Sequence, residues 1–324
     1  MVFKIAQDGL TLPRRFSEPK QPGERLSELR AVVLLAGSVR ADPLRKSTGR
    51  NIFELPVATH FTVLDCWRQQ LMAMASHFGV DPLAVRIIVD RHVPMNMAKG
   101  KDSGIEISVE QDPSEFRGTA GLLSDLARDY GDNDYMLVVR ASQILIEPLA
   151  DLARLLVHAH ADVSLMCLDD GSPVGLSLVR CGCLRQINTV GFVDFNEQAL
   201  PSIAKNGHVQ VVRYSQAVGM PIRTVNNYLD ALRAYHRFAS GRFGDAMDGR
   251  EEWYATFGII EPGAAVHPDA VVHDSVVLGG ARVEHDAILV RSVICPGAVI
   301  RSGQCVIDSL VASGGSGYRG GNKR

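Results

Sequence analysis

The apolar and polar positions divide the chain into a longer first region and a shorter, repetitive second one. In the first region, short apolar runs rich in β-branched residues alternate with segments whose apolar residues recur at helical spacing. The run at 31–35, AVVLL, favours a buried strand because it is short and β-branched. The segment 61–78 has helical spacing and is followed by Gly79, so we expect a helix that ends there.

The later runs continue this alternation up to residue 239. We expect further strands at 84–89, 105–109, 135–139, 163–168, 179–193 and 209–214, and further helices at 121–130, 148–161 and 226–239. The alternation predicts an α/β domain with a mainly parallel sheet. Such sheets bind ligands beyond the carboxyl ends of their strands, so the loop at 36–50 lies at an expected binding edge.

A different pattern occupies the end of the chain. Glycine recurs with a period of 17 at Gly263, Gly280, Gly297 and Gly314, and serine and alanine positions share that period. Within each unit a small residue stands two before an aliphatic one, and the aliphatic positions step by 6 or 5 along the chain. Three short strands per turn, with aliphatic side chains inward, form a β-solenoid. The spacing resembles the hexapeptide repeat of left-handed β-helices, and we expect a platform for packing and oligomerisation.

These patterns predict the domain boundaries. A polar extension with three prolines precedes the first strand, and a stretch of glycine and mixed charge without periodicity separates the two regions. The Gly-rich C-terminus is expected to be a disordered tail. The expected parts are the extension 1–29, the α/β domain 30–239, the linker 240–259, the left-handed β-helix 260–313 and the tail 314–324.

Composition excludes several classes of function. The net charge of −2 over 324 residues lacks the excess of basic residues that is typical of nucleic-acid-binding proteins. With 46% apolar and 22% charged residues the chain resembles a soluble globular protein, and no apolar run approaches the ~20 residues of a membrane span. The N-terminus shows no signal peptide, and the six cysteines form no zinc pattern. We therefore expect a cytoplasmic protein with reduced thiols that binds neither nucleic acid nor a membrane.

The loop after the first strand combines small and cationic residues. The strand runs into Ala36, Gly37 and Ser38, where the backbone can approach a ligand closely, and Arg40 and Arg50 follow. A strand, a small-residue turn and cationic side chains together can hold a phosphate ester. A buried strand followed by an ordinary loop explains these residues alone equally well.

The same stretch resembles the N-terminal signature of the sugar-1-phosphate nucleotidyltransferases, the nucleotide-sugar pyrophosphorylases. The matching segments are 35–37 (LAG), 43–44 (PL) and 55–57 (LPV). The resemblance implies a Rossmann-like nucleotidyltransferase domain in which Leu35, Ala36, Gly37 and Ser38 contact the nucleotide. It also implies that Arg40 is the catalytic arginine, contacting the triphosphate, and that Arg50 contacts the sugar phosphate. The glycine-rich part is two residues shorter than in the family, and the family's Pro-Lys is missing.

Two further segments extend the resemblance. Gly118, Thr119, Ala120 and Gly121 precede an apolar helix, where exposed N–H groups suit a base edge or a phosphate. They resemble the family's L-G-T-A-G-A-L, which implies a position close to the nucleotide base. Gly191 resembles a glycine of the family's G-I-Y segment, which borders the sugar pocket, although phenylalanine replaces the tyrosine here.

The family binds Mg²⁺ mainly through two aspartates, and the resemblance implies their positions in this chain. Ser142 and Pro221 stand there instead, so both carboxylates are missing. Two hypotheses remain. The first is a nucleotide-sugar pyrophosphorylase-like enzyme with impaired catalysis, which would use Mg²⁺ if active. The second is a non-catalytic regulatory or scaffold homologue, without a cofactor, that binds a nucleotide sugar or a partner subunit. Both imply a homo- or hetero-oligomer formed through the β-helix.

Overall fold

The computed structural model describes most of the chain as two compact units. The described residues are 28–36, 43–89, 100–102, 104–111, 117–187, 190–239, 256–314 and 317–319. The first unit comprises 1–40, 68–141 and 147–219, and the second comprises 41–67, 142–146 and 220–324. Each unit is therefore assembled from segments that are separated in the sequence. Within the described ranges, no helix has the length and apolar character that a membrane crossing requires.

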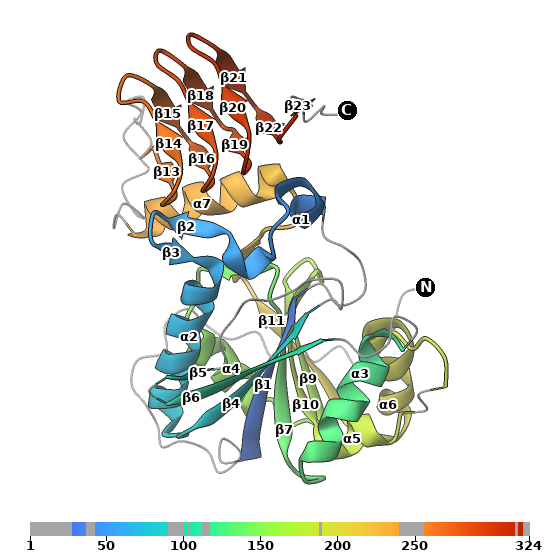
Figure 1. Cartoon of the computed structure of the whole chain (residues 1–324). Coiled ribbons are helices and arrows are strands. Elements are labelled where there is room, and N and C mark those ends of the chain that lie inside the picture. The colour runs from blue at the N-terminus through green and yellow to red at the C-terminus, as the bar shows by residue number, and fades with distance from the viewer. Residues whose placement is uncertain are drawn as a thin grey trace. The chain divides into compact units, whose positions relative to one another are not determined.

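An eight-stranded sheet is the framework of the first unit, in the order β11-β9-β10-β7-β1-β4-β6-β5 (Figure 1). Its strands are β1 (Leu29–Ala36), β4 (Leu83–Val89), β5 (Gly100–Asp102), β6 (Ile105–Gln111), β7 (Tyr135–Arg140), β9 (Val163–Leu168), β10 (Pro173–Arg180) and β11 (Val209–Tyr214). Of these described strands, β10 and β5 run antiparallel to their neighbours and the others pair in parallel. The expected α/β unit with a mainly parallel sheet is thus confirmed.

The four expected helices occur as α2, α3 with η3, α4 and α7, and the chain also forms short helical segments that were not expected. The helices are α1 (Pro43–Thr48), η2 (Ile52–Glu54), α2 (Val63–Phe78), α3 (Gly118–Leu126), η3 (Ala127–Asp129), α4 (Leu149–His158), α5 (Cys181–Arg185), η4 (Phe195–Ala199), α6 (Leu200–Asn206) and α7 (Val225–Ala239). In the first unit, α3, α5 and α6 join β1 and β7 in one buried apolar cluster that includes Val33, Leu123, Met136, Leu184 and Ile203. These three helices therefore cover a single face of the sheet, as Figure 1 also shows.

The expected strand at 179–193 is wrong. Strand β10 ends at Arg180, and the segment that follows it forms α5. Residues 181–184 are all buried, which a strand with alternating faces would not achieve. Gly182 also packs tightly, because a Cβ atom there would lie 2.8 Å from the carbonyl oxygen of Asp132. Consecutive burial of small and apolar residues against this loop favours a helical turn.

In the second unit, strands that are one repeat period apart in the sequence pair in parallel. We call residues 256–314 the repeat region; its strands are β13 (Gly258–Ile260), β14 (Ala265–Val266), β15 (Val271–His273), β16 (Ser275–Val277), β17 (Arg282–Val283), β18 (Ile288–Val290), β19 (Val293–Ile294), β20 (Val299–Ile300), β21 (Cys305–Ile307) and β22 (Ser309–Val311). They form three sheets, β13-β16-β19-β22, β14-β17-β20 and β15-β18-β21, and β23 (Gly317–Arg319) pairs antiparallel with β22. Val276 pairs with Val293 and Leu289 with Val306, so each pair is separated by one period of the repeat. Figure 1 shows successive turns of this chain stacked on one another.

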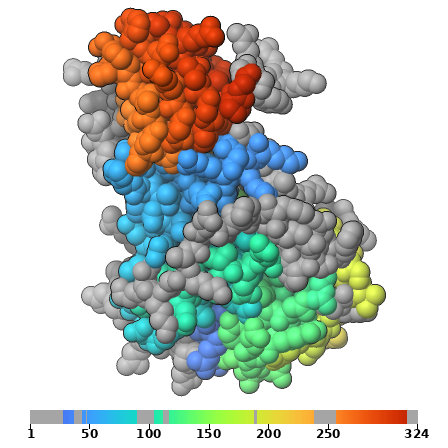
Figure 2. Space-filling model, in the orientation of Figure 1, coloured from blue at the N-terminus to red at the C-terminus, as the bar shows by residue number. Residues whose placement is uncertain are grey.

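The aliphatic positions of the repeat form its core, as the pattern predicted. Val277, Val283, Leu289, Ile294 and Ile300 belong to one buried cluster, together with the small residues Ala281, Ala287 and Ala298. Figure 2 shows the outer surface of the repeat region (orange to red). Because each turn covers the apolar side chains of the next, stacking is what removes this core from water.

Other segments of the second unit are joined to the repeat region by side chains. These segments contain α1, β2 (Pro56–Ala58), β3 (Phe61–Thr62), β8 (Gln143–Leu145), the end of β12 (Gly219–Pro221) and α7. Arg233 of α7 forms an ion pair with Asp274 at 3.0 Å, and Arg50 forms one with Glu261 at 2.6 Å. The Tyr228 hydroxyl joins α7 to β2 by donating to the carbonyl oxygen of Pro56. The expected division into 30–239 and 260–313 therefore differs from the structure, which groups 41–67 and α7 with the repeat. Most of the expected extension and most of the expected linker lie outside the described residues. The tail expected to be disordered instead contains β23, whose backbone pairs with β22.

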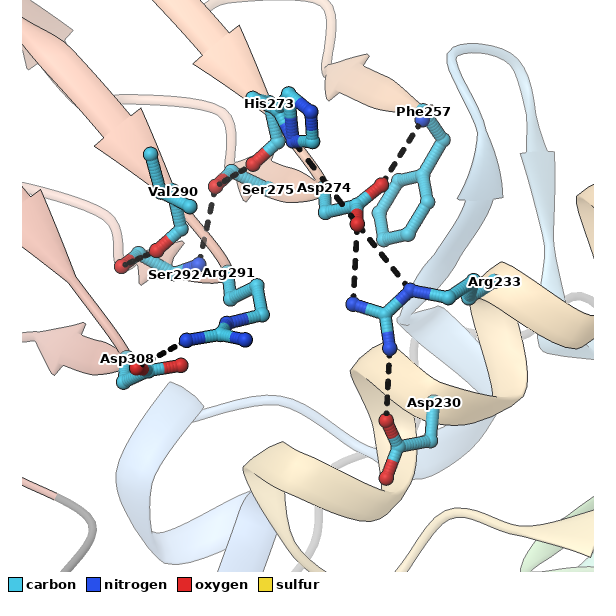
Figure 3. A network of polar contacts seen from close by, with 10 residues as sticks. All are labelled: Asp230, Arg233, Phe257, His273, Asp274, Ser275, Val290, Arg291, Ser292 and Asp308. Atoms are coloured by element: carbon cyan, nitrogen blue, oxygen red, sulfur yellow. Dashed lines mark hydrogen bonds and ion pairs between the residues drawn. The ribbon is translucent and has the colours of Figure 1, made fainter. Parts of the chain in front are cut away.

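A ladder of polar contacts connects α7 with one corner of the repeat region (Figure 3). Asp274 accepts bonds from Arg233 Nε and Nη2 at 3.2 and 3.0 Å and from the backbone nitrogen of Phe257 at 3.3 Å. Next to it, the Ser275 hydroxyl accepts from Ser292 N at 3.0 Å, and the Ser292 hydroxyl accepts from Ser309 N at 3.2 Å. The serines that recur once per period thus bond one turn to the next.

Candidate functional site

The carboxyl end of β1 lies at the expected binding edge of the first unit. Leu35 and Ala36 are half-buried, and Leu35 pairs in register with Arg140 at the end of β7. The Leu35 carbonyl oxygen accepts a bond of 2.9 Å from the Ala141 nitrogen, so these two central strands end together. Gly37, Ser38 and Arg40, which the sequence assigned to the nucleotide and to catalysis, lie outside the described residues.

Gly118 begins α3 in a conformation that requires glycine. Its φ is +67°, in the left-handed region, and a Cβ atom would lie 2.3 Å from the carbonyl oxygen of Val193. Both the backbone angle and this approach exclude a side chain. The first glycine of the motif therefore brings α3 against the segment that contains Val193.

Hydrogen bonds complete the junction between the start of α3 and residues 193–195. The Ala120 nitrogen donates to the Val193 carbonyl oxygen at 3.0 Å, and the Val193 nitrogen donates to the Arg117 carbonyl oxygen at 3.0 Å. The Thr119 hydroxyl accepts from the Phe195 nitrogen at 2.9 Å. Ala120 is fully buried, so its N–H group is used by the protein itself. The nucleotide-binding role of Gly118, Thr119, Ala120 and Gly121 stays a prediction.

The junction also brings Gly191 close to this motif. Gly191 stands two residues before Val193, has a φ of +79°, and has no atom within 4 Å of where its Cβ would lie. Val190 and Phe192, on either side, are 85% and 49% exposed. Two segments assigned from sequence to the base and to the sugar thus lie together in the first unit, with open space at Gly191.

Asp194 is a residue near the candidate site that the sequence reasoning missed. Its Oδ1 accepts bonds from the nitrogens of Asn196 and Glu197 at 2.8 and 3.0 Å, and the Thr119 hydroxyl donates to its Oδ2 at 3.4 Å. Asp194 is therefore the cap of η4 and holds Thr119 in place. An aspartate placed directly before a short helical segment was the signal that could have identified this cap.

The two positions that lack metal-binding aspartates lie next to each other in the second unit. Ser142 precedes β8 and Pro221 ends β12, and these strands form a two-stranded sheet. The Ile222 nitrogen donates to the Ser142 carbonyl oxygen at 3.0 Å. A hydroxyl group and a proline ring do not supply the anionic oxygen ligands that Mg²⁺ prefers, so this pair does not fit that ion. No group of three or more His, Cys, Asp or Glu residues in the described ranges could hold a metal.

Arg50 contacts the repeat region. Its Nη1 lies 2.6 Å from Glu261 Oε1, and Glu261 Oε2 accepts a bond of 2.7 Å from the Gly279 nitrogen. The guanidinium thus already has an anionic partner within the second unit. The role assigned to Arg50 from the sequence, contact with a sugar phosphate, stays a prediction, and a phosphate would have to compete with Glu261.

Buried cysteines supply no nucleophile to these sites. Burial raises the pKa of the Cys66 and Cys181 thiols to about 12 and that of Cys295 to about 11. Burial also raises the pKa of Cys183, the partner of Cys181 in the C-x-C sequence. These raised pKa values favour the protonated thiol over the reactive thiolate.

Among known proteins, similarity was found in solved structures. No family model matches the sequence, and none of the curated proteins matches it. A crystal structure from Bacillus anthracis, assigned as a glucose-1-phosphate thymidylyltransferase and solved in complex with sucrose, is 14% identical with a TM-score of 0.49 and covers 63% of this chain and 94% of its own. A homologue, from Mycobacterium sp. strain JC1, of a Mycobacterium tuberculosis protein is 18% identical with a TM-score of 0.43 and covers 65% of this chain and 98% of its own.

Proposed function

We propose that this chain is a nucleotide-sugar pyrophosphorylase-like protein that binds a nucleotide or nucleotide sugar in its first unit and has lost most or all catalysis. One observation carries the binding part. Three segments that the sequence assigned to the nucleotide and sugar are distant in the chain, yet Leu35 and Val193 pack against the same buried apolar cluster to which Ala120 belongs. Leu35 lies at the carboxyl end of β1, and parallel sheets bind ligands at that edge.

The loss of catalysis follows from the chemistry of the reaction. A sugar-1-phosphate oxygen attacks the α-phosphorus of a nucleoside triphosphate, the bond to the β-phosphate breaks, and pyrophosphate leaves with its electron pair. A metal clamp on these phosphates typically contributes several kcal/mol of transition-state stabilisation. Since each 1.36 kcal/mol is about tenfold in rate, a chain without the clamp should be slower by roughly 10³-fold or more. Ser142 and Pro221 cannot hold it.

A second candidate function is a regulatory or scaffold subunit. Arg50 is engaged by Glu261, and ion pairs join the repeat region to 41–67 and to α7. This makes the second unit a rigid platform of stacked parallel strands. In this proposal the repeat is a left-handed β-helix, and its outer surface forms a homo- or hetero-oligomer.

Calorimetry with nucleoside triphosphates and NDP-sugars tests the binding part. Gly191→Asn adds a side chain where space is free, and asparagine tolerates a positive φ better than most residues. We expect this variant to weaken binding at least tenfold. Gly79→Asn is the matched control, since Gly79 has a φ of +65° and equally free space but follows α2. No heat with any of these ligands would leave only the scaffold function.

Pyrophosphate release in Mg²⁺ tests the catalytic part. We expect no release above background over several nucleotides and sugar phosphates, and no rescue by Ser142→Asp alone, because Pro221 remains. Metal-dependent release at ordinary enzyme rates, about 1–10³ s⁻¹, would contradict the proposal.

A further inference from the structure

The repeat region carries a groove on its outer surface. Its volume is about 540 Å³, within the usual range for small-ligand sites of roughly 300–1,000 Å³. The lining residues are Ala265, Val266, His267, Pro268, Arg282, Val283, Glu284 and His285. They come from β14 and β17 and from the turn that follows each strand, so parallel stacking alone creates the groove.

Two histidines meet in this groove. His267 follows β14 and His285 follows β17, and their ring centroids lie 5.9 Å apart with an edge-on angle of 67°. Both side chains are exposed to solvent. The backbone pairing of His267 N with Val283 O, at 2.9 Å, holds the two turns in this register. Residues from successive turns thus become neighbours.

Each of the two rings has a carboxylate at Nδ1. Nδ1 of His285 lies 2.9 Å from Asp286 Oδ2 and 3.1 Å from the Ser302 hydroxyl. Nδ1 of His267 accepts a bond of 3.3 Å from the Asp269 backbone nitrogen and lies 3.5 Å from Asp269 Oδ2. Asp269 and Asp286 are separated by one period, so the repeat supplies this partner twice. Because Nδ1 has a protein partner on both rings, the nitrogen left for a ligand is Nε2. For His267 to bind through Nε2, its ring proton must move to Nδ1, next to the Asp269 carboxylate.

We propose that His267 and His285 bind one divalent transition-metal ion, of the Zn²⁺ class, through their Nε2 atoms. A carboxylate at the other ring nitrogen is the usual partner of a metal-binding histidine, where it sets the tautomer and the ring orientation. With metal–nitrogen distances of about 2.0–2.1 Å, two imidazoles on one ion have centroids about 5–6 Å apart, as found here. Imidazole suits Zn²⁺ and its neighbours rather than Mg²⁺ or Ca²⁺.

Two histidines leave part of the coordination sphere open. Because no third His, Cys, Asp or Glu completes a metal cage within the described residues, the remaining positions belong to water or to an anionic oxygen that enters the groove. The site is therefore of the open kind. It uses residues of the repeat region alone and is independent of nucleotide binding in the first unit.

The test is a titration of the full-length, tag-free protein stripped with chelator. Zn²⁺ calorimetry should show one ion per chain with a micromolar Kd, and Co²⁺ should give the visible absorption of a bound ion. His267→Ala and His285→Ala should each weaken binding at least tenfold, and Asp286→Asn should weaken it less. His273→Ala is the matched control, since this exposed histidine of the same region lies 3.9 Å from Asp274 but is not one of the pair.

A second control separates the histidines from the exposed thiol of Cys305. Cys305→Ser should leave the affinity unchanged. Unchanged affinity in the His267→Ala, His285→Ala double variant would overturn the proposal, as would the absence of binding at millimolar Zn²⁺. Circular dichroism of each variant shows whether the fold is retained, which we expect because both side chains are exposed.

Discussion

The two sheet systems of this protein are both built on parallel strands, but they pair residues at very different sequence separations. In the first unit, Val32 of β1 pairs with Val85 and with Leu137. In the repeat region every parallel pair joins residues that are one period of the repeat apart. Long connections bring unrelated segments to one edge of the first sheet, where different side chains can combine. The short period instead stacks similar side chains, so its surface features also recur.

This comparison predicts where single changes have large effects. In the first unit one glycine holds together segments that are far apart in the sequence. In the repeat region, equivalent positions on different turns can carry the same residue in different surroundings, as Asp274 and Asp308 do. One such position then serves as a control for the other.

Gly118→Ala should have the largest effect on stability. The new methyl group would lie 2.3 Å from the Val193 carbonyl oxygen, and the backbone φ of +67° is unfavourable for alanine. Strain and displacement of this junction should cost about 3 kcal/mol or more, measured by urea unfolding. Gly79→Ala, at a φ of +65° with free space, should cost only about 1 kcal/mol. Equal losses would show that contact with Val193 is unimportant.

Leu289→Ala tests the core of the repeat region. Leu289 is fully buried in the cluster shared by the three sheets, so its truncation should cost about 2–5 kcal/mol. The adjacent Ile288 points outward and is 42% exposed, and Ile288→Ala should cost under about 1 kcal/mol. Hydrogen exchange of peptides from 258–311 would report the loss locally. A similar loss for both variants would contradict the inward placement of the aliphatic positions.

Asp274→Asn and Asp308→Asn compare two equivalent corners of the repeat region that are two periods apart in the sequence. Figure 3 shows both ion pairs, Arg233 with Asp274 and Arg291 with Asp308. The side chains of Asp274 and Arg233 are 12% and 25% exposed, whereas those of Asp308 and Arg291 are 53% and 50% exposed. Charged hydrogen bonds gain strength with burial, so Asp274→Asn should cost about 1–2 kcal/mol and Asp308→Asn under about 1 kcal/mol. Asparagine tolerates the positive φ at both positions. Thermal unfolding of both variants provides the measurement, and an equal loss would count against the effect of burial.

The smallest effect should be a pH dependence in the first unit. Arg86 Nε and Nη2 each lie 2.7 Å from a Glu110 oxygen. Burial alone would raise the pKa of Glu110, but the hydrogen bonds and charge of Arg86 outweigh it and hold the pKa below 4.5. The pair therefore stabilises the fold above pH 4.5, and this contribution disappears as the pH falls through the lowered pKa.

Glu110→Gln removes the titrating group while it keeps the shape of the side chain. The stability difference between wild type and Glu110→Gln should be under about 1 kcal/mol at neutral pH because Glu110 is one-third exposed. It should shrink as the pH falls below 4.5 and through the lowered pKa of Glu110. Urea unfolding at a series of pH values would measure it. A difference that stays constant with pH would assign the effect to packing.

The elements of the first unit were predicted more accurately than its junctions. The strand at 31–35 and the helix at 61–78 occur as β1 and α2, because period and β-branching are local properties. The strand expected at 179–193 was wrong, since α5 there results from contact with the loop at Asp132. At the candidate site, the sequence alone shows that serine and proline occupy positions 142 and 221. Their adjacency, through the bond from Ile222 N to Ser142 O, was not.

The sequence by itself determined the parallel α/β unit and the periodic stacking of the repeat, because both depend on the order and period of apolar residues along the chain. Only the tertiary structure decided that Gly118 packs on Val193, that Arg50 pairs with Glu261 and that His267 meets His285. It also decided that α7 belongs with the repeat region. These contacts join segments through side-chain shape and charge after the backbone has folded, and no local pattern of residues encodes them.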